Sequence, residues 1–338
     1  MSDNLIQAPK FDFGAAVTQI FNLPGGNGYL FRVIGFGALI TFVATASLGI
    51  PILKAYVTFF SLMMDIDLVG QSETEQLDAM MDGLAPIFAS MGLFFLLYIF
   101  QFGTYISVET ALYRNIIHEE DKGFFPLRFG SDECKVLLTR IVVAAIIYAV
   151  FFAVYFGGAI FGFILFALSG GIENVAVLGI IGIFVTLIVL AVIGIIIYAA
   201  IRLGPSAAFS VREPDFTPVG SWSPMKTYFW PTFGALLVIG GVGYIGLMVI
   251  YLLAIGVILA TSGILPAMMS MDVESETYPD FSPVLDSLSS AGFIIPVCIF
   301  GVILIAFSLL YFGAIWSTWG YVAKLTEPRL ESHERVES

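Results

Sequence analysis

Six long apolar stretches divide the sequence and constrain its fold more than any other feature. A transmembrane α-helix needs about 20 consecutive apolar residues to cross roughly 30 Å of hydrocarbon, and every stretch is longer than that. The segment at 175–201, VAVLGIIGIFVTLIVLAVIGIIIYAAI, is apolar on every side, whereas the strands of a membrane barrel are shorter and alternate in polarity. The six stretches are 31–63, 84–117, 137–168, 175–201, 229–260 and 292–322. The sequence therefore predicts an all-α integral membrane protein with six transmembrane helices.

Composition narrows the classes of function. Hydrophobic residues make up 59% of the 338 residues and charged residues only 12%, a balance far outside the range of water-soluble domains. The six helices leave no room for a separate enzymatic domain, so we expect a single membrane domain. The N-terminal sequence MSDNLIQAPKFDFGAAV has no basic region followed by an apolar core and a small-residue cleavage site, so we expect it to be uncleaved.

Charge is distributed unevenly between the two ends of the predicted helices. Of 14 Lys and Arg residues, 13 lie in the termini, in the connections 114–140 and 202–228, or close to those ends, and Lys54 is the exception. The opposite segments, 65–82, 169–174 and 262–290, hold 12 acidic residues and no basic one. Positive charge favours the cytoplasmic side, so we predict a multi-pass protein of the bacterial inner membrane with both termini cytoplasmic.

The same asymmetry suggests partners. A basic cytoplasmic rim would meet anionic membrane lipids, and acidic outer loops would attract cations or basic partners. Alternatively, the outer loops are acidic only because Lys and Arg are excluded from them. No dense basic patch is interleaved with exposed aromatics, so we expect no binding of nucleic acid.

The helices also look alike in pairs. The second stretch ends TALYRNI and the fourth ends YAAIRLG, which aligns Ala111 with Ala199 and Arg114 with Arg202. These matches suggest three helical-hairpin repeats, at 1–118, 119–213 and 214–328, followed by a polar tail at 329–338. The third unit departs from the pattern, with Trp316 near the position of the arginines. The alternative is that helical hairpins with basic flanks resemble one another by chance.

The connectors FFPLRFGSDECK and FTPVGSWSPMK favour helix starts. Ser223 is placed to cap a helix whose first residue is Pro224, and Ser131 to cap one with Asp132 and Glu133 in its first turn. We expect amphipathic interfacial helices here, lying in the cytoplasmic headgroup layer before each span. The candidate interfacial basic residues are Arg114, Arg128, Lys135, Arg140, Arg202 and Lys226.

Reactive side chains are few. The chain has only two histidines, His118 and His333, so a His-rich metal site is not available. Pairing of Cys134 with His118 as a nucleophile has no support from spacing, and Cys298 lies within an apolar stretch, which argues against a disulfide. No nucleotide-binding, metalloprotease or serine-hydrolase motif occurs in a suitable context. We therefore expect no catalytic residues, no cofactor and no metal.

Polar residues inside the spans are the remaining candidates, because charge is costly in hydrocarbon. Lys54, near the outer end of the first span, either snorkels to the interface or partners Asp65, Asp67 or Gln101. Glu109 either forms a local or interhelical ion pair or, with Lys54 and Gln101, lines a transport pathway.

A pair of glycines spaced by three residues marks one further candidate. Gly158 and Gly162 form a GxxxG pattern. Such spacing is typical of close helix contact, within a bundle or between protomers.

The paired spans, the connectors of the FFPLRFGSDECK type and the span ending ALYR resemble bacterial inner-membrane proteins similar to the membrane domain of some glycerophosphodiester phosphodiesterases. The resemblance implies a membrane module without catalytic residues, since the phosphodiesterase domain itself is absent from this sequence. The leading hypothesis is a non-enzymatic membrane scaffold or accessory subunit that binds lipid, a second copy or another membrane protein. The alternative is a small-solute or ion transporter or channel.

Overall fold

The computed structural model describes residues 9–65, 73–120, 123–168, 175–263, 266, 287 and 290–326. All regular structure in these ranges is helical, and six helices are long and apolar enough to cross a membrane, as predicted. They are α2 (Gly26–Asp65), α3 (Glu73–His118), α4 (Ser131–Leu168), α5 (Val175–Leu203), α7 (Met225–Thr261) and α10 (Ala291–Leu325). Three short helices are also described over their whole length, α1 (Phe13–Thr18), η1 (Gln19–Phe21) and α6 (Ser206–Arg212).

The helix starts follow local hydrogen bonding but differ in detail from the predicted caps. α4 begins at Ser131 itself, and the Glu133 carboxylate in its first turn accepts a 2.9 Å hydrogen bond from the Gly130 backbone N–H. α7 begins at Met225, after Pro224, with no side-chain cap. The predicted cap by the Ser223 side chain is therefore wrong, because backbone carbonyls accept hydrogen bonds from the first N–H groups of α7 instead. The Ser223 carbonyl, for example, accepts from the Lys226 N–H at 3.1 Å.

The predicted interfacial helices also need correction. α4 and α7 each run unbroken into their spans, so no separate amphipathic helix precedes them. The short helix that does occur between α5 and α7 is α6, and its residues 206–211 are buried within the protein rather than exposed to headgroups.

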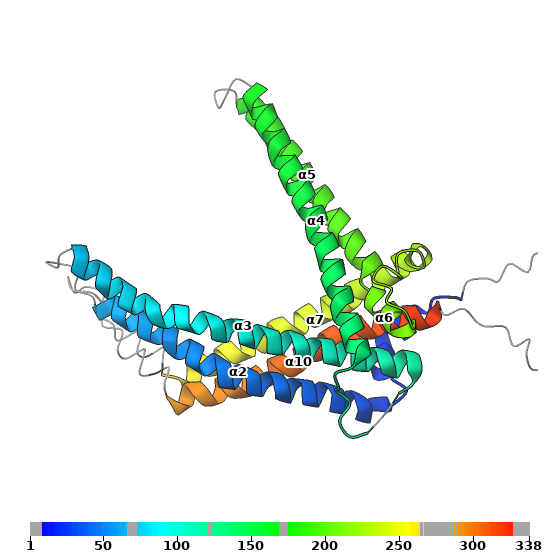
Figure 1. Cartoon of the computed structure of the whole chain (residues 1–338), viewed down its shortest axis with the longest axis horizontal. Helices are drawn as coiled ribbons and strands as arrows, with labels where there is room; N and C mark the ends of the chain where they lie inside the picture. Colours follow the sequence, from blue (N-terminus) through cyan, green and yellow to red (C-terminus); the bar gives the residue numbers. More distant parts are fainter. Residues whose placement is uncertain are drawn as a thin grey trace, which may run out of the picture.

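The long helices form three antiparallel hairpins, α2–α3, α4–α5 and α7–α10 (Figure 1). The first and third hairpins pack side by side into a four-helix bundle, in which α10 contacts α2, α3 and α7. The α4–α5 hairpin leaves this bundle at one end and diverges from it (Figure 1). α3 ends at His118 and α6 at Arg212, while the division of the sequence into three repeat units stays a prediction.

All three hairpins meet at one end of the molecule, which we call the connector end. It comprises residues 9–25, the connector residues 119–120, 123–130 and 204–224, and the last turns of α10. The two described chain ends lie together here, because the Tyr321 hydroxyl of α10 accepts a 3.2 Å hydrogen bond from the Asp12 N–H. The main hydrophobic cluster joins η1, α2, α3, α6 and α10 near this end. Close packing there requires a small residue at Gly37, where a Cβ would lie 2.8 Å from Val108.

Candidate functional site

The three intramembrane polar residues singled out by sequence do not form one site. Lys54 is exposed on α2. Gln101 of α3 donates a 3.3 Å hydrogen bond to Thr45 of α2. At about 1.5 Å per helical residue, Lys54 lies about 14 Å from Thr45 along α2, toward the end of the helix opposite the connector end. Glu109 lies about 12 Å from Gln101 along α3, toward the connector end. The proposed acidic partner Asp67 is outside the described residues.

Glu109 is instead part of a buried ion pair between α3 and α4. Its side chain is only 2% exposed, and the guanidinium of Arg140 on α4 donates to both carboxylate oxygens. Tyr113, one turn further along α3, donates a 2.8 Å hydrogen bond to the same carboxylate. Of the two predicted kinds of ion pair, local and interhelical, the structure shows the interhelical one, with Arg140 as the partner.

Arg140 joins four parts of the chain at one point. Besides Glu109, its guanidinium donates to the Gly204 carbonyl at 3.1 Å, at the end of α5, and to the Tyr113 hydroxyl at 3.2 Å. Its Cζ lies 4.7 Å from the centre of the Trp319 ring of α10, a cation–π distance. Gly204 permits this packing, since a Cβ there would lie 2.6 Å from Trp319. We call the group formed by Glu109, Tyr113, Arg140, Gly204 and Trp319 the polar junction.

A second buried ion pair joins the same two helices, but here α3 supplies the cation and α4 the anion. Arg114 of α3 donates to Glu133 of α4 at 2.5 Å, and both side chains are at most 5% exposed. The other oxygen of Glu133 holds the first turn of α4 through Gly130, as described above. The base of α4 is thus fixed to α3 by two reciprocal buried ion pairs, which define how the α4–α5 hairpin leaves the bundle.

Arg202, which sequence aligns with Arg114, makes an equivalent contact. It donates to the carbonyl of Trp222, 20 residues further on and just before α7 begins, and its Cζ lies 4.1 Å from the Trp222 ring centre. Arg114 reaches Glu133, 19 residues further on, at the start of α4. Each arginine therefore ties the end of one hairpin to the beginning of the next, while duplication of the sequence itself stays a prediction.

Hydrogen bonds from α6 complete the connector end. Thr139 of α4 and Ser210 of α6 share a 2.9 Å hydroxyl–hydroxyl bond, and His118 of α3 lies 3.1 Å from the Val211 carbonyl through Nε2. His118 is therefore engaged with α6, and no hydrogen bond between it and Cys134 is found in the described residues. Cys134 and Cys298 are both free and exposed.

The interpretation of the basic residues as headgroup-facing is wrong for half of the set. Arg114 and Arg202 are each 4% exposed, and Arg140 is largely covered, because acceptors from neighbouring helices surround them. Lys135 is partly buried and donates to the carbonyls of Glu213 and Pro214 at 3.0 and 2.8 Å. Arg128 and Lys226 are exposed, as expected of interfacial cations.

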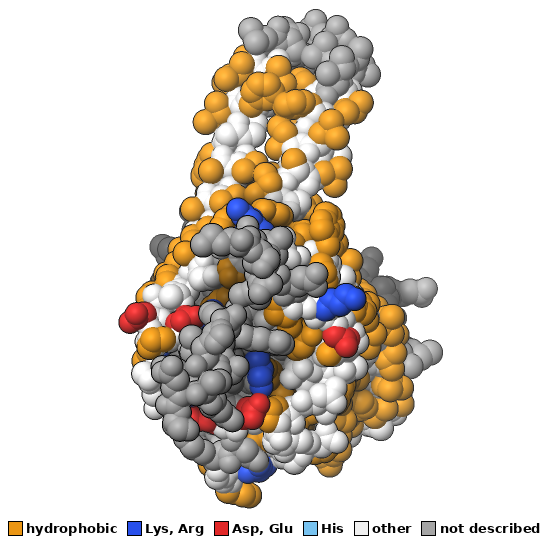
Figure 2. Space-filling view, turned by 90° about the vertical axis from the view of Figure 1, so that its right-hand side faces the viewer, with side chains coloured by type: hydrophobic (Ala, Val, Ile, Leu, Met, Phe, Trp, Pro, Cys, Tyr) orange, Lys and Arg blue, Asp and Glu red, His pale blue; other side chains and the backbone are white. Residues whose placement is uncertain are grey.

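The α4–α5 hairpin has little packing of its own beyond its base. Gly158 contacts α5, since a Cβ there would lie 3.4 Å from Ile188. Among the described residues, Gly162 has no neighbouring atom within 4 Å of that position, so there a contact is found at Gly158 and not at Gly162. Figure 2 shows hydrophobic side chains over the visible face of the hairpin, with charged side chains at its base and on the end of the bundle.

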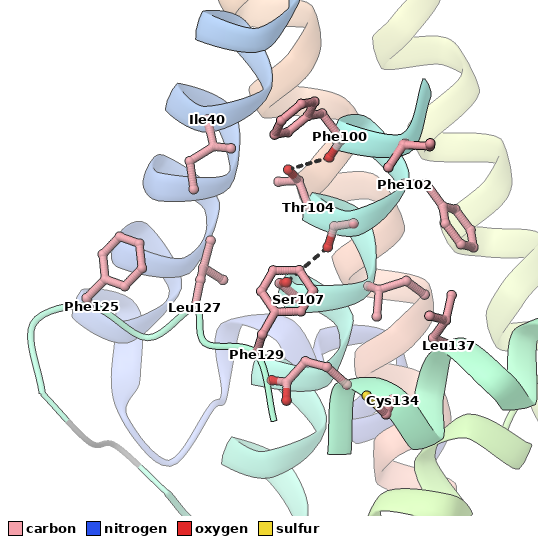
Figure 3. Close-up of a pocket in the computed structure, with 14 residues that line it drawn as sticks. Ile40, Phe100, Phe102, Thr104, Ser107, Phe125, Leu127, Phe129, Cys134 and Leu137 are labelled. Atoms are coloured by element: carbon pink, nitrogen blue, oxygen red, sulfur yellow. Dashed lines mark hydrogen bonds between the residues drawn. The ribbon is translucent and has the colours of Figure 1, made fainter. Parts of the chain in front are cut away.

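A large apolar cavity lies between α2, α3, the connector and the start of α4 (Figure 3). Its volume is about 580 Å³, within the roughly 300–1,000 Å³ range of ligand sites. None of Lys54, Gln101 and Glu109 lines it. Its lining includes Ile40, Phe100, Ile106, Phe125, Phe129 and Leu137. Sequence reasoning missed this cavity, and the aromatic residues of the connector were the available signal.

At the connector end, an ion pair joins α10 to the residue that follows α3. Lys324 of α10 donates a 2.8 Å hydrogen bond to Glu119, directly after α3. This hydrogen bond, followed by the charge of Lys324, lowers the pKa of Glu119 below its usual value. Within the described ranges, no three His, Cys, Asp or Glu side chains gather as a metal site would require.

Comparison of the chain with family models, curated proteins and solved structures finds no match. The fold and the site together define a polytopic α-helical membrane protein in which two hairpins form a bundle and a third diverges from it. The resemblance to the membrane domain of glycerophosphodiester phosphodiesterases stays a prediction from the sequence.

Proposed function

We propose that this protein is a non-enzymatic scaffold or accessory subunit of the bacterial inner membrane, with cytoplasmic termini, that binds another membrane protein through its α4–α5 hairpin. One observation carries the proposal. The hairpin is fixed at its base by two buried ion pairs, yet beyond that base its helices pack on no other helix in the part of the chain that the structure describes.

The energetics of buried ion pairs support this interpretation. Taking two charges out of water offsets much of their attraction, so such pairs contribute more to a defined geometry in some proteins than to net stability. Here the two pairs hold the angle at which the hairpin leaves the bundle. A fixed angle is what a surface needs in order to meet a partner without an additional loss of conformational freedom.

The surface of the hairpin suits contact with transmembrane helices. In lipid, helices associate through close packing at small residues rather than through hydrophobicity. Gly157 and Gly162 of α4 and Gly182 and Gly194 of α5 have open space where a Cβ would lie. A partner backbone could approach closely at these positions, whereas bulky side chains would keep it away.

Crosslinking in native membranes tests the proposal. Gly162→Cys in a chain carrying Cys134→Ser and Cys298→Ser places one thiol on the diverging hairpin, and a short bifunctional reagent followed by mass spectrometry identifies what it joins. Gly92→Cys is the matched control, because Gly92 lies on α3 with equally open surroundings. We expect a discrete protein adduct at position 162 and none at position 92. A chain that stays free at both positions would contradict the proposal.

Transport is not proposed, although it was the alternative from sequence. A pathway along Lys54, Gln101 and Glu109 would need them to face one passage. Instead Gln101 is bonded to α2 and Glu109 to α4.

A further inference from the structure

The cavity between α2, α3, the connector and α4 has walls that offer a ligand almost no polar contact. The Thr104 hydroxyl donates to the Phe100 carbonyl and the Ser107 hydroxyl to the Gly103 carbonyl, both at 2.9 Å, so each is satisfied by its own helix (Figure 3). The Glu133 carboxylate at one end is bonded to Arg114 and to the Gly130 N–H. A polar ligand would lose its hydration here without replacement. The occupant must therefore be apolar.

The position of the cavity indicates which apolar molecule reaches it. Along α3 it extends from Ile99 to Ser107, about 12 Å at 1.5 Å per residue. The span runs from Leu84 to His118, so most of this stretch lies in the half nearer to the connector end. The rim residues Ile99, Phe100 and Phe129 are exposed, so the cavity opens to the bilayer in the leaflet at that end. An acyl chain of a membrane lipid lies at this depth and in this direction.

A polar recess adjoins the apolar cavity at Phe125, which lines both. The recess also contains Arg114, Glu120 and Arg128. The Arg128 side chain is half exposed and donates a 2.9 Å hydrogen bond to Glu120. An exposed pair of this kind contributes at most about 1 kcal/mol. Because a guanidinium carries five donors, Arg128 can bind a phosphate without giving up Glu120.

The wall between the two compartments is fixed by aromatic packing. Phe125 lies edge-on to Phe36 of α2 at a centroid distance of 4.7 Å, and Phe124 packs on the same ring at 5.3 Å. Phe125 is thus held where an acyl chain would meet its headgroup. From this arrangement we propose that the cavity binds one acyl chain of an anionic phospholipid, whose phosphate lies on Arg128. This site is separate from the α4–α5 surface and does not depend on a partner protein.

Two variants of the full chain test the two compartments. Gly103→Leu projects a side chain into the cavity, and its Cβ would lie 3.7 Å from Phe129, an ordinary contact. Arg128→Gln removes the phosphate cation. The matched controls are Gly92→Leu, on α3 away from the cavity, and Lys226→Gln, an exposed cation of α7 that does not line the recess.

The measurement is native mass spectrometry of the protein titrated with dioleoyl phosphatidylglycerol or dioleoyl phosphatidylcholine in detergent. Each methylene excluded from an apolar site lowers affinity about fourfold, so Gly103→Leu should weaken binding of both lipids at least tenfold. One cation near the membrane surface favours an anionic lipid about fivefold. Arg128→Gln should therefore remove a preference of about that size for phosphatidylglycerol, and both controls should bind as wild type. Equal affinity of the wild type for the two lipids, or unchanged binding by Gly103→Leu, overturns the proposal.

A wild-type measurement covers the case in which Gly103→Leu does not fold. Phosphatidylglycerol with a photoactivatable diazirine on one acyl chain should label peptides from 99–107 and 123–137 in preference to 84–98. Uniform labelling of these peptides would contradict an anionic phospholipid site. The same conclusion would follow if unlabelled oleic acid competed with the probe as effectively as unlabelled phosphatidylglycerol does.

Discussion

Replacing Glu109 by Gln should destabilise the protein by about 3 kcal/mol. Gln preserves the shape of the side chain but removes its charge, and Arg140 then keeps its own charge on a side chain that is only 18% exposed. Removing one partner of a buried pair costs about 3–5 kcal/mol. The Gln carbonyl can still accept one hydrogen bond, and Arg140 keeps the Gly204 carbonyl and the Trp319 ring, so the lower end of that range applies.

Reversible unfolding in mixed micelles, followed by circular dichroism, measures this cost. Gln101→Ala is the control, because it removes one 3.3 Å side-chain hydrogen bond on the same helix, and such bonds within membranes average about 0.6 kcal/mol. The double variant Glu109→Gln/Arg140→Met removes both charges and should recover most of the loss, since apolar replacement of a whole pair is often neutral. If Glu109→Gln costs no more than Gln101→Ala, the polar junction does not hold α4 as described.

Three other outcomes follow from the connector end. Arg114→Met should leave its buried carboxylate partner on α4 uncompensated and destabilise the protein by about 3 kcal/mol. Hydrogen exchange in the first turn of α4 should become faster. Unchanged exchange would contradict the role of Arg114 in holding the start of α4. Gly204→Ala should displace Trp319, because a Cβ would lie 2.6 Å from that ring, and tryptophan fluorescence should shift; an unshifted spectrum would contradict the close packing. Glu119→Gln should lower the Tm at neutral pH, because it removes the ion pair with Lys324. This pair lowers the pKa of Glu119 in the folded protein and is lost on protonation, so the Tm difference from wild type should vanish as pH falls through that pKa. A Tm difference that does not change with pH would contradict this role of the Glu119 charge.

The spans were readable from sequence because hydrocarbon imposes the same length and apolarity on every helix. How the hairpins pack against one another could not be predicted in this way. Glu109 was singled out because a charge within a span is energetically costly and therefore indicates a partner or a function. Its partner Arg140, however, lies 31 residues away on another helix. Which face of α4 turns toward α3 depends on the path of the connector, and no periodicity in a helix that is apolar all round reveals it.

Burial of the basic residues was also beyond the reach of the sequence. Arg128 and Arg140 both fall in the same connector region, and counting charges treats them alike. Only one of them is enclosed, because α3, α5 and α10 all contribute groups around Arg140. The apolar cavity depends in the same way on where Phe125 and Phe129 come to rest against α2 and α3.

The contacts of Arg114 and Arg202 have a consequence for synthesis. A chain emerging from the ribosome completes α3 before the first turn of α4 exists, and it completes α5 before the turn that precedes α7. Each arginine therefore lacks its contact with the next helix until 19 or 20 further residues have emerged, although Arg202 can already donate to the Tyr198 hydroxyl of its own helix. The third unit carries Trp316 near that position instead of an arginine. The first and second hairpins thus each carry an arginine whose contact with the following hairpin forms only once the next helix begins.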